Sequence, residues 1–211
     1  MLLAVMMLLG TFTAGMTVSA ENTTYYDVTE DMWAYGDIVY VTENGLMNGT
    51  GGGSFTPKAN LTRSMVITVL YRMEGSPKVS FKVEDYLDVP EDQFYSDATA
   101  WAYKNGIITG TSTDEWGIPT ISPSRDITRQ ELTTMFVRYA GYKHVKLDYS
   151  IDLGAFTDSG KVASWASDAM KWAVDVGLIR GTGDGTTLSP EGKATREQFA
   201  TIIHRYCEAE F

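Results

Sequence analysis

The sequence predicts a mainly α-helical fold in which three helix-loop-helix repeats pack together with near-threefold symmetry. The first observation is a Thr-Arg pair that occurs three times, five residues after a proline and nine residues before a second arginine. The second is helical spacing of the apolar residues after each pair, and the third is a glycine motif ahead of each pair. The pairs are Thr62-Arg63, Thr128-Arg129 and Thr195-Arg196.

The first 20 residues resemble a secretory signal peptide. They carry no charge, contain an apolar run from Leu2 to Leu9, and end in the small-residue sequence Val18-Ser19-Ala20. The alternative is a buried apolar helix. We therefore expect a signal peptide at 1–20 and repeats at 21–75, 76–141 and 142–211, in a protein that is secreted.

The composition of the chain argues against several kinds of partner and site. The 211 residues carry 17 Lys and Arg against 27 Asp and Glu, a net charge of -10, which argues against nucleic acid or an anionic membrane as partner. No second apolar stretch is long enough to span a bilayer, so we expect no membrane insertion after signal cleavage. Cys207 is the single cysteine, which excludes an intrachain disulfide and a cysteine-based metal site. No cofactor is expected.

Each repeat opens with a segment that we expect to be helical and to end at a glycine. The motif Gly-[Leu/Ile]-[Met/Ile]-x-Gly-Thr begins at Gly45, Gly106 and Gly177, and a glycine is a common helix terminator. Two aromatic positions precede it by twelve and five residues, so they would share one helix face. They are Trp33 and Tyr40, Phe94 and Trp101, and Trp165 and Trp172.

The Thr-Arg pair begins the second helix of each repeat. Apolar residues at offsets 3, 6, 7 and 10 from the arginine form one buried stripe, for example Phe199, Ile202, Ile203 and Tyr206. The threonine is the expected N-cap, and it opens a capping box in the second and third repeats. The trailing arginines, predicted to support packing or solubility, are Arg72, Arg138 and Arg205.

Loops complete the repeats. The loop of the second repeat, Ser112 to Ile121, is about five residues longer than its counterparts. Segments 76–90 and 142–155 join the repeats, and their prolines, glycine and mixed charge leave room for an extra short helix or strand.

These motifs resemble the S-layer homology repeat, in order and in triplicate. The resemblance rests on segments such as Gly45 to Gly49, Phe55-Thr56-Pro57 and Leu61-Thr62-Arg63, and it covers residues 25 to 208. It implies a pseudo-trimeric, mostly helical module that anchors exported proteins to secondary cell wall polymers of bacteria, often through pyruvylated amino sugars. Ser64-Met65 in place of Ala-Glu and Phe94 in place of Trp depart from the pattern.

The resemblance and the local chemistry together select the candidate ligand-binding residues. An arginine at the first helical position lies beside backbone N–H groups and the positive end of the helix dipole, and its planar fork suits a carboxylate. A tryptophan offers an apolar face to a sugar ring, and a glycine allows close approach to the backbone. The candidates are Arg63, Arg129, Arg196, Trp33, Trp165, Gly49, Gly110 and Gly181.

Structural roles compete with these assignments. Each arginine could instead pair with an acid of a neighbouring repeat, and Trp33 and Trp165 are divided between core and groove, whereas Trp101 and Trp172 are expected in the core. Among the arginines, Arg196 is favoured because its own repeat contains Trp165, Gly181 and an intact cap.

The sequence therefore predicts a non-catalytic anchoring module at the bacterial cell surface, with a secondary cell wall polysaccharide as ligand and a surface-layer or cargo protein as a further partner. The alternatives are a structural surface-layer or protein-interaction module and, less favoured, a wall glycan hydrolase. No catalytic residue or metal ligand is assigned, because neither His144 nor His204 accompanies a nucleophile motif. A standalone anchor, a wall-organising protein and a fragment of a longer protein all fit this arrangement.

Overall fold

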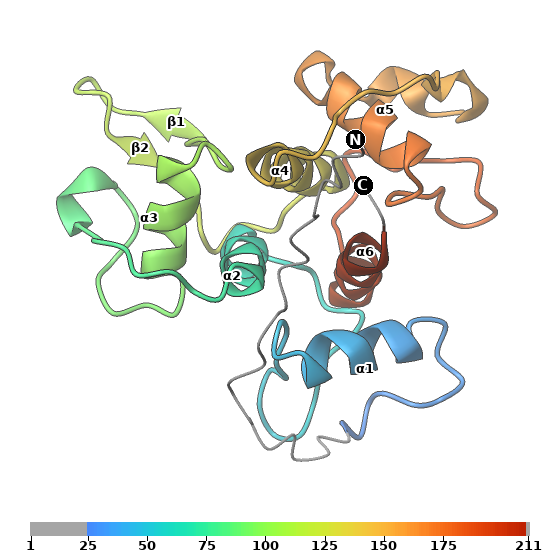
Figure 1. Ribbon diagram of the computed structural model, residues 1–211, viewed down its shortest axis with the longest axis horizontal. Coiled ribbons are helices and arrows are strands. Elements are labelled where there is room, and N and C mark those ends of the chain that lie inside the picture. The colour runs from blue at the N-terminus through green and yellow to red at the C-terminus, as the bar shows by residue number, and fades with distance from the viewer. Residues whose placement is uncertain (1–24, 210–211) are drawn as a thin grey trace, which may run out of the picture.

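The computed structural model describes residues 25–209, so the predicted signal peptide lies outside the described residues (Figure 1). This part of the chain is mostly helical, as predicted. Short 3-10 turns lie at Val83–Asp85, Leu153–Ala155, Ser159–Lys161 and Ser164–Ala166. The longer elements are α1 (Tyr35–Glu43), α2 (Arg63–Met73), α3 (Ser96–Lys104), β1 (Ser112–Thr113), β2 (Pro119–Thr120), α4 (Arg129–Tyr142), α5 (Ser167–Asp175) and α6 (Arg196–Glu208).

The three Thr-Arg helices α2, α4 and α6 occupy the centre of the molecule, and α1, α3 and α5 surround them (Figure 1). The main helix contacts are between α1 and α6, α2 and α3, and α4 and α5. Each outer helix therefore packs on the Thr-Arg helix of the preceding repeat, and α1 of the first repeat packs on α6 of the last. One repeat is thus not one packing unit, since every helix pair combines two repeats.

A closed cycle of backbone hydrogen bonds joins the segments that lead into the three central helices. The N–H of Leu61 donates to the carbonyl of Ala194 at 2.9 Å, that of Ile127 to Leu61 at 2.9 Å, and that of Ala194 to Ile127 at 3.1 Å. Each residue directly precedes a Thr-Arg pair, donates once and accepts once. This cycle satisfies six buried backbone groups and places the pseudo-threefold axis between the three segments.

The predicted caps of the central helices are confirmed. The side-chain oxygens of Thr62, Thr128 and Thr195 accept from the backbone N–H three residues later. Thr128 with Glu131 and Thr195 with Gln198 form complete capping boxes. Substitution of such a cap typically costs about 1 kcal/mol, so these threonines help to define where the helices start.

The outer helices are shorter than the sequence predicts. They begin two residues after the first aromatic position, so Trp33, Phe94 and Trp165 precede the helices and do not share a helix face with the later aromatics. The prediction was wrong at this end because no threonine or similar cap marks the start, and none of the three N-cap residues makes a side-chain cap hydrogen bond. At the other end, the terminating glycines have φ angles of +66°, +69° and +74°, as a left-handed terminator requires.

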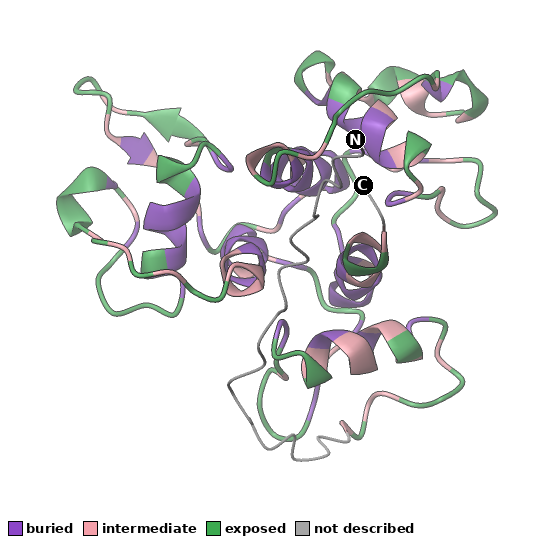
Figure 2. Ribbon diagram, viewed as in Figure 1, coloured by how far each residue is buried: buried purple, intermediate pink, exposed green. Residues whose placement is uncertain are grey.

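Buried residues concentrate on the central helices and on the inner faces of α3 and α5 (Figure 2). The core includes most of the predicted apolar stripe, such as Phe199 and Ile203, and also the predicted core aromatics Trp101 and Trp172. Tyr139 packs against Tyr206 at 5.7 Å and against Trp101 at 6.5 Å between ring centroids. Packing between repeats therefore supplies the core that no single repeat could form.

The longer loop of the second repeat folds into the β1–β2 hairpin, in which Ser112 pairs with Thr120 and Thr113 with Pro119. The joining segments contain the short helical turns at Val83–Asp85 and Leu153–Ala155, as the sequence allowed. Across residues 25–209, no helix combines the length and apolar character that a bilayer crossing requires.

Candidate functional site

The three candidate arginines are buried and make the same pair of contacts in each repeat. Their Nε atoms donate to the carbonyl two residues before the proline of the following repeat, and their Nη2 atoms donate to the carbonyl just before the second motif glycine of that repeat. For Nε the distances are 2.9 Å from Arg63 to Ile121, 2.8 Å from Arg129 to Leu188 and 2.7 Å from Arg196 to Phe55. For Nη2 they are 3.4 Å to Thr109, 3.2 Å to Arg180 and 2.7 Å to Asn48.

Each arginine thus reaches into the following repeat, and that of the last repeat reaches into the first. Arg196 lies over the ring of Phe55, with 4.3 Å between its Cζ and the ring centroid. The prediction that Arg196 is surrounded by Trp165 and Gly181 was wrong, because Arg129 bonds to the carbonyl next to Gly181. The error arose because the arginine and the groove aromatic of one repeat belong to different packing units.

The N-terminal N–H groups of the central helices are already paired. The N–H of Arg63 donates to Arg125, that of Arg129 to Gly192 and that of Arg196 to Ala59, at 2.9–3.0 Å. The next N–H in each helix donates to the carbonyl of the following repeat's proline: Ser64 to Pro123, Gln130 to Pro190 and, closing the ring, Glu197 to Pro57. The expectation that an anion would meet unpaired backbone donors here was therefore wrong, because loop carbonyls of the neighbouring repeat satisfy them.

Burial lowers the pKa of all three arginines, that of Arg63 to about 10. A pKa of about 10 still leaves the Arg63 guanidinium charged at neutral pH. A nearby aspartate of the following repeat opposes the effect in each case, namely Asp88, Asp158 and Asp27. The alternative that each arginine pairs with an acid of a neighbouring repeat is thus only partly confirmed. An aspartate of that repeat lies nearby, but the Nε and Nη2 hydrogen bonds go to backbone carbonyls.

These aspartates form a second triplicate feature. Asp27 accepts from the N–H groups of Phe55 and Thr56, both at 2.8 Å. Asp88 bonds in the same way to residues 121 and 122, and Asp158 to residues 188 and 189. Sequence reasoning missed this role, although an aspartate six or seven residues before each exposed aromatic was a usable signal.

The loop residues that these aspartates hold have an unusual backbone. Thr56, Ser122 and Ser189 have φ angles of +52°, +56° and +50°, in the left-handed region that side chains other than glycine rarely adopt. Each directly precedes the proline of its repeat. The aspartate bonds therefore hold a strained turn that directs the proline carbonyl onto the neighbouring helix N-terminus.

The candidate glycines are required by their own loops. A Cβ on Gly181 would lie 2.1 Å from the carbonyl oxygen of Gly185, and one on Gly49 would lie 2.6 Å from that of Ser54. A Cβ on Gly110 would lie 2.9 Å from the Cβ of Pro119 and 2.9 Å from the carbonyl oxygen of Ser112. The close approach that we predicted for a ligand is thus made here by the chain itself, and ligand contact at these glycines stays a prediction.

The first aromatic of each repeat is exposed. The exposed fractions are 62% for Trp33, 64% for Phe94 and 57% for Trp165. Trp33 and Trp165, for which the sequence left core and groove open, therefore lie on the surface and not in the core. An exposed aromatic ring at the same position of every repeat is accessible to a ligand, although single exposed aromatics also occur on protein surfaces without one. Ligand contact by Trp33 and Trp165 remains a prediction.

One of these aromatics borders a well-formed groove of ≈ 660 Å³, which we call the Trp33 groove. The N-terminal loop and the proline loop of the first repeat form its walls, together with the start of α6 from the last repeat. Its lining comprises Asp27, Asp31, Met32, Trp33, Thr56, Pro57, Lys58, Ala59 and Glu197. The groove therefore lies at a junction between two repeats, where only the assembled ring can form it.

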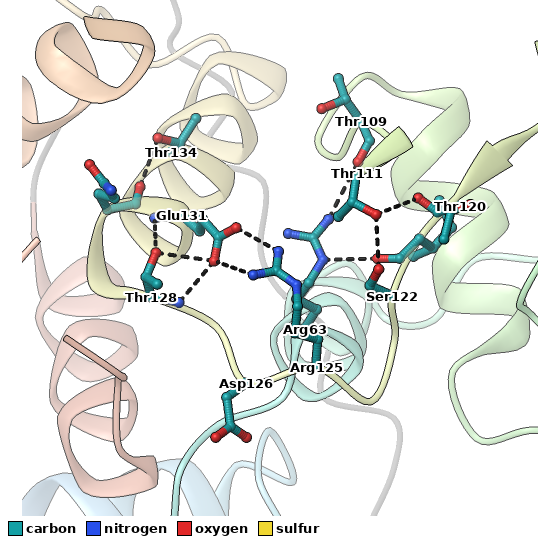
Figure 3. Close-up of polar contacts among 12 residues, drawn as sticks. Arg63, Thr109, Thr111, Thr120, Ser122, Arg125, Asp126, Thr128, Glu131 and Thr134 are labelled. Carbon is teal, nitrogen blue, oxygen red and sulfur yellow. Dashed lines mark hydrogen bonds and ion pairs between the residues drawn. The ribbon is translucent and has the colours of Figure 1, made fainter. Parts of the chain in front are cut away.

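The junction of the first and second repeats has a different charge. The Arg63 and Arg125 guanidinium groups lie close together, and Glu131 faces them from α4 (Figure 3). Arg125 donates to Glu131 at 2.6 and 3.3 Å, and it is partly exposed. Burial raises the pKa of Glu131, but the hydrogen bonds from Arg125 and Thr128 outweigh this and lower it overall. Glu131 is thus in direct contact with Arg125, whereas Arg63 has Glu131 and Asp88 nearby but, among the described residues, no carboxylate within hydrogen-bond distance.

Other reactive side chains have structural partners. His204 is half-buried and lies 2.7 Å from Asp37 through Nδ1 and 3.2 Å from Glu208 through Nε2. It also stacks on Tyr40 at 4.1 Å, so it links α6 to α1. Within residues 25–209, no group of three or more His, Cys, Asp or Glu side chains is arranged to hold a metal ion.

The sequence comparisons agree with this triplicate architecture. The family model of the S-layer homology domain matches residues 24–64, 85–133 and 155–200, one match for each repeat. The chain belongs to the S-layer homology domain family. Domains of this family are non-catalytic modules that bind cell-wall polysaccharide, and proteins that contain them are associated with the cell wall and surface.

Similar proteins contain this module as a small part of a longer chain. The chain is 30% identical to the Surface-layer 125 kDa protein of Lysinibacillus sphaericus over 80% of its own length and 13% of that protein. It is 28% identical to an endoglucanase of Bacillus sp. (strain KSM-635), over 85% of the chain and 18% of the enzyme. It is 26% identical to an amylopullulanase of Thermoanaerobacterium thermosulfurigenes, over 94% of the chain and 10% of the enzyme. It thus spans less than a fifth of these relatives.

Proposed function

We propose that this module anchors its protein to the cell wall by binding a polysaccharide with anionic substituents, and that the junction of the first and second repeats receives an anionic group. The observation that carries the proposal is the Arg63–Arg125–Glu131 cluster. One guanidinium charge there is left without a matching carboxylate in direct contact. A carboxylate on a sugar, such as the ketal of a pyruvylated amino sugar, would match that charge.

Geometry near the cluster supports the proposal. The hydroxyls of Thr111 and Ser122 lie 2.8 Å apart beside Arg63 and offer hydrogen bonds to a sugar (Figure 3). Phe94, the exposed aromatic of the second repeat, belongs to the loop region that precedes α3, which packs on α2. Charge selection and a flat apolar surface would therefore be supplied by the same pair of repeats.

Sedimentation with purified cell wall sacculi tests the proposal. We expect the chain to pellet with intact sacculi and to remain in solution after the secondary polymer has been extracted. Equal pelleting with both preparations would contradict it. Self-association without pelleting would favour the alternative of a structural surface-layer module, and release of reducing ends would favour a glycan hydrolase.

A variant can test the proposed anion site without disturbing the core. We expect Arg125→Ala to weaken wall binding about tenfold, since its side chain is partly exposed and donates to Glu131 alone among the described residues. Lys104→Ala removes the same charge from an exposed position of the same repeat and should bind normally. Equal binding by both variants would overturn the assignment of this junction.

A further inference from the structure

The Trp33 groove contains a carboxylate whose role the anion site does not explain. Glu197 is the second residue of α6 and lines the groove, yet it is 8% exposed. Its backbone N–H donates to the carbonyl of Pro57 at 2.9 Å. Its Oε2 atom is buried and has no hydrogen-bond partner within the described residues. Since a buried polar atom normally has a partner, this oxygen is an acceptor without a donor.

The equivalent residues of the other two central helices are satisfied within the chain. Gln130 in α4 accepts from the N–H of Ala163 at 2.9 Å, beside the exposed Trp165. Ser64 in α2 shares a hydrogen bond of 3.0 Å with Thr62. Glu197 therefore differs from its counterparts both in its charge and in the open acceptor, so the three junctions are not chemically equivalent.

The charges around Glu197 decide which ligands this groove can accept. Asp27, Asp31 and Glu197 outnumber Lys58 among the lining residues, so the groove is acidic. Asp27 is occupied, because it accepts from Ser54 and from two backbone N–H groups. A carboxylate placed against Glu197 would be repelled, whereas a hydroxyl or an ammonium group could donate to it.

Apolar groups complete the groove. Trp33 presents a largely exposed ring, and Met32, Pro57 and Ala59 line the same space. A flat aromatic surface next to a buried acceptor fits a sugar ring, because the ring can stack while its polar substituents donate. A volume of ≈ 660 Å³ is large enough for a short oligosaccharide.

We propose that the Trp33 groove binds a sugar residue without a carboxylate, a hexosamine, which donates a hydrogen bond from a hydroxyl or amino group to Oε2 of Glu197 while its ring stacks on Trp33. The inference rests on the proposed function in one respect, that the ligand is a cell-wall glycan. It adds that neighbouring junctions select different sugars of that glycan, an anionic one near Arg63 and Arg125 and an uncharged or amine-bearing one at Glu197.

Calorimetric titration with defined probes tests the inference. The probes are the trimer of N-acetylglucosamine, the trimer of glucosamine and, as the anionic probe, an oligomer of glucuronic acid. We expect the wild-type chain to bind at least one of the two amino sugar trimers, and the Arg125→Ala chain, which lacks the proposed anion site, to bind the anionic oligomer at least about tenfold more weakly than that trimer. Glu197→Ala and Trp33→Ala should each weaken binding of the trimer by at least about tenfold.

The Glu197→Gln variant distinguishes a hydroxyl donor from an ammonium donor on the sugar. If a hydroxyl donates, the amide oxygen can still accept, and affinity for the N-acetylated trimer should fall less than about threefold. If an ammonium donates, the lost charge should lower affinity for the glucosamine trimer by at least about tenfold. Glu43→Gln, an exposed change of equal charge on α1, is the matched control and should bind as the wild type does.

Two results would overturn the inference. One is that the wild-type chain binds neither trimer, or that Glu197→Ala binds them as the wild type does. The other is that Glu197→Gln lowers the free energy of unfolding of the ligand-free chain, because Oε2 would then have a partner inside the protein. Sacculus binding that depends on Arg125 alone would leave the proposed function intact while this inference failed.

Discussion

The guanidinium group of Arg196, in the last repeat, donates to the carbonyl of Phe55, in the first repeat, at 2.7 Å and lies over its ring. A second bond of 2.7 Å reaches the carbonyl of Asn48. These contacts join segments separated by 141 and 148 positions in the sequence. Arg63 and Arg129 make the equivalent bonds to their following repeats, so the arginines of the Thr-Arg pairs connect each repeat to the next and close the ring.

Because of these contacts, we expect Arg196→Ala to lower the free energy of unfolding by about 2–4 kcal/mol. The substitution removes one donor from each of the Phe55 and Asn48 carbonyls and removes the cation over the Phe55 ring. Arg138→Ala is the control, since Arg138 is exposed and makes a long contact of 3.5 Å to Thr109, and it should change stability by less than about 0.5 kcal/mol. Urea unfolding followed by circular dichroism measures both. Similar midpoints would show that Arg196 does not hold the repeats together.

Two glycine substitutions should change stability in opposite directions. Gly181→Ala places a Cβ 2.1 Å from a backbone oxygen, so we expect a loss of at least about 2 kcal/mol. Gly36 lies in α1 with open space around its Cα, and Gly36→Ala should stabilise the chain by about 0.4–1 kcal/mol through helix propensity. Melting temperatures from calorimetry would show the contrast. Equal shifts for both variants would contradict it.

Acid should weaken the loop that Asp158 holds. Burial raises the pKa of Asp158, but the hydrogen bonds from Leu188 and Ser189 outweigh it and lower the pKa overall. A lowered pKa in the folded state means that the contribution is present above the unfolded value of about 3.9 and is lost as pH falls through the folded value. We expect Asp158→Asn to cost on the order of 1 kcal/mol at pH 7, and the difference from wild type to shrink below about pH 4.

Urea unfolding at pH 7, 5 and 3 measures this dependence. Asp148→Asn is the control, because Asp148 is exposed and pairs with the exposed Lys146. Such surface pairs contribute little, so this variant should follow the wild type at every pH. A constant difference between Asp158→Asn and the wild type from pH 7 to pH 3 would exclude the proposed role of the charged carboxylate.

Substitution of an exposed tryptophan should affect ligand binding, whereas substitution of a buried tryptophan should affect the stability of the fold. We expect Trp165→Ala to reduce sacculus binding while changing the free energy of unfolding by less than about 1 kcal/mol, because the side chain is exposed. Trp172→Ala removes a fully buried ring and should cost about 3–5 kcal/mol. Pelleting assays and urea unfolding of the same preparations measure both effects. Unaltered binding by a folded Trp165→Ala chain would remove this aromatic from the proposed ligand site.

Local patterns in the sequence were sufficient to predict the repeat, the central helices and their caps. Thr128 and Glu131 lie three residues apart, and a capping box depends on little else, so its geometry followed from the chain itself. The same holds for Gly45, Gly106 and Gly177, whose left-handed conformation terminates the outer helices. The outer helix starts were not predictable in this way, because they have no side-chain cap.

The candidate site depended on contacts that are distant in sequence. The order of residues identified Arg63, Arg129 and Arg196 as special but assigned each to the aromatic of its own repeat, whereas each bonds to the next repeat. The open acceptor of Glu197 likewise depends on which loop lies against α6.

Sequence by itself therefore determined the family, the helices and the residue types at the junctions, because these follow from short-range periodicity and capping. Only the tertiary structure decided which residues meet at each junction and with what net charge, because the ring pairs every helix with a partner from another repeat.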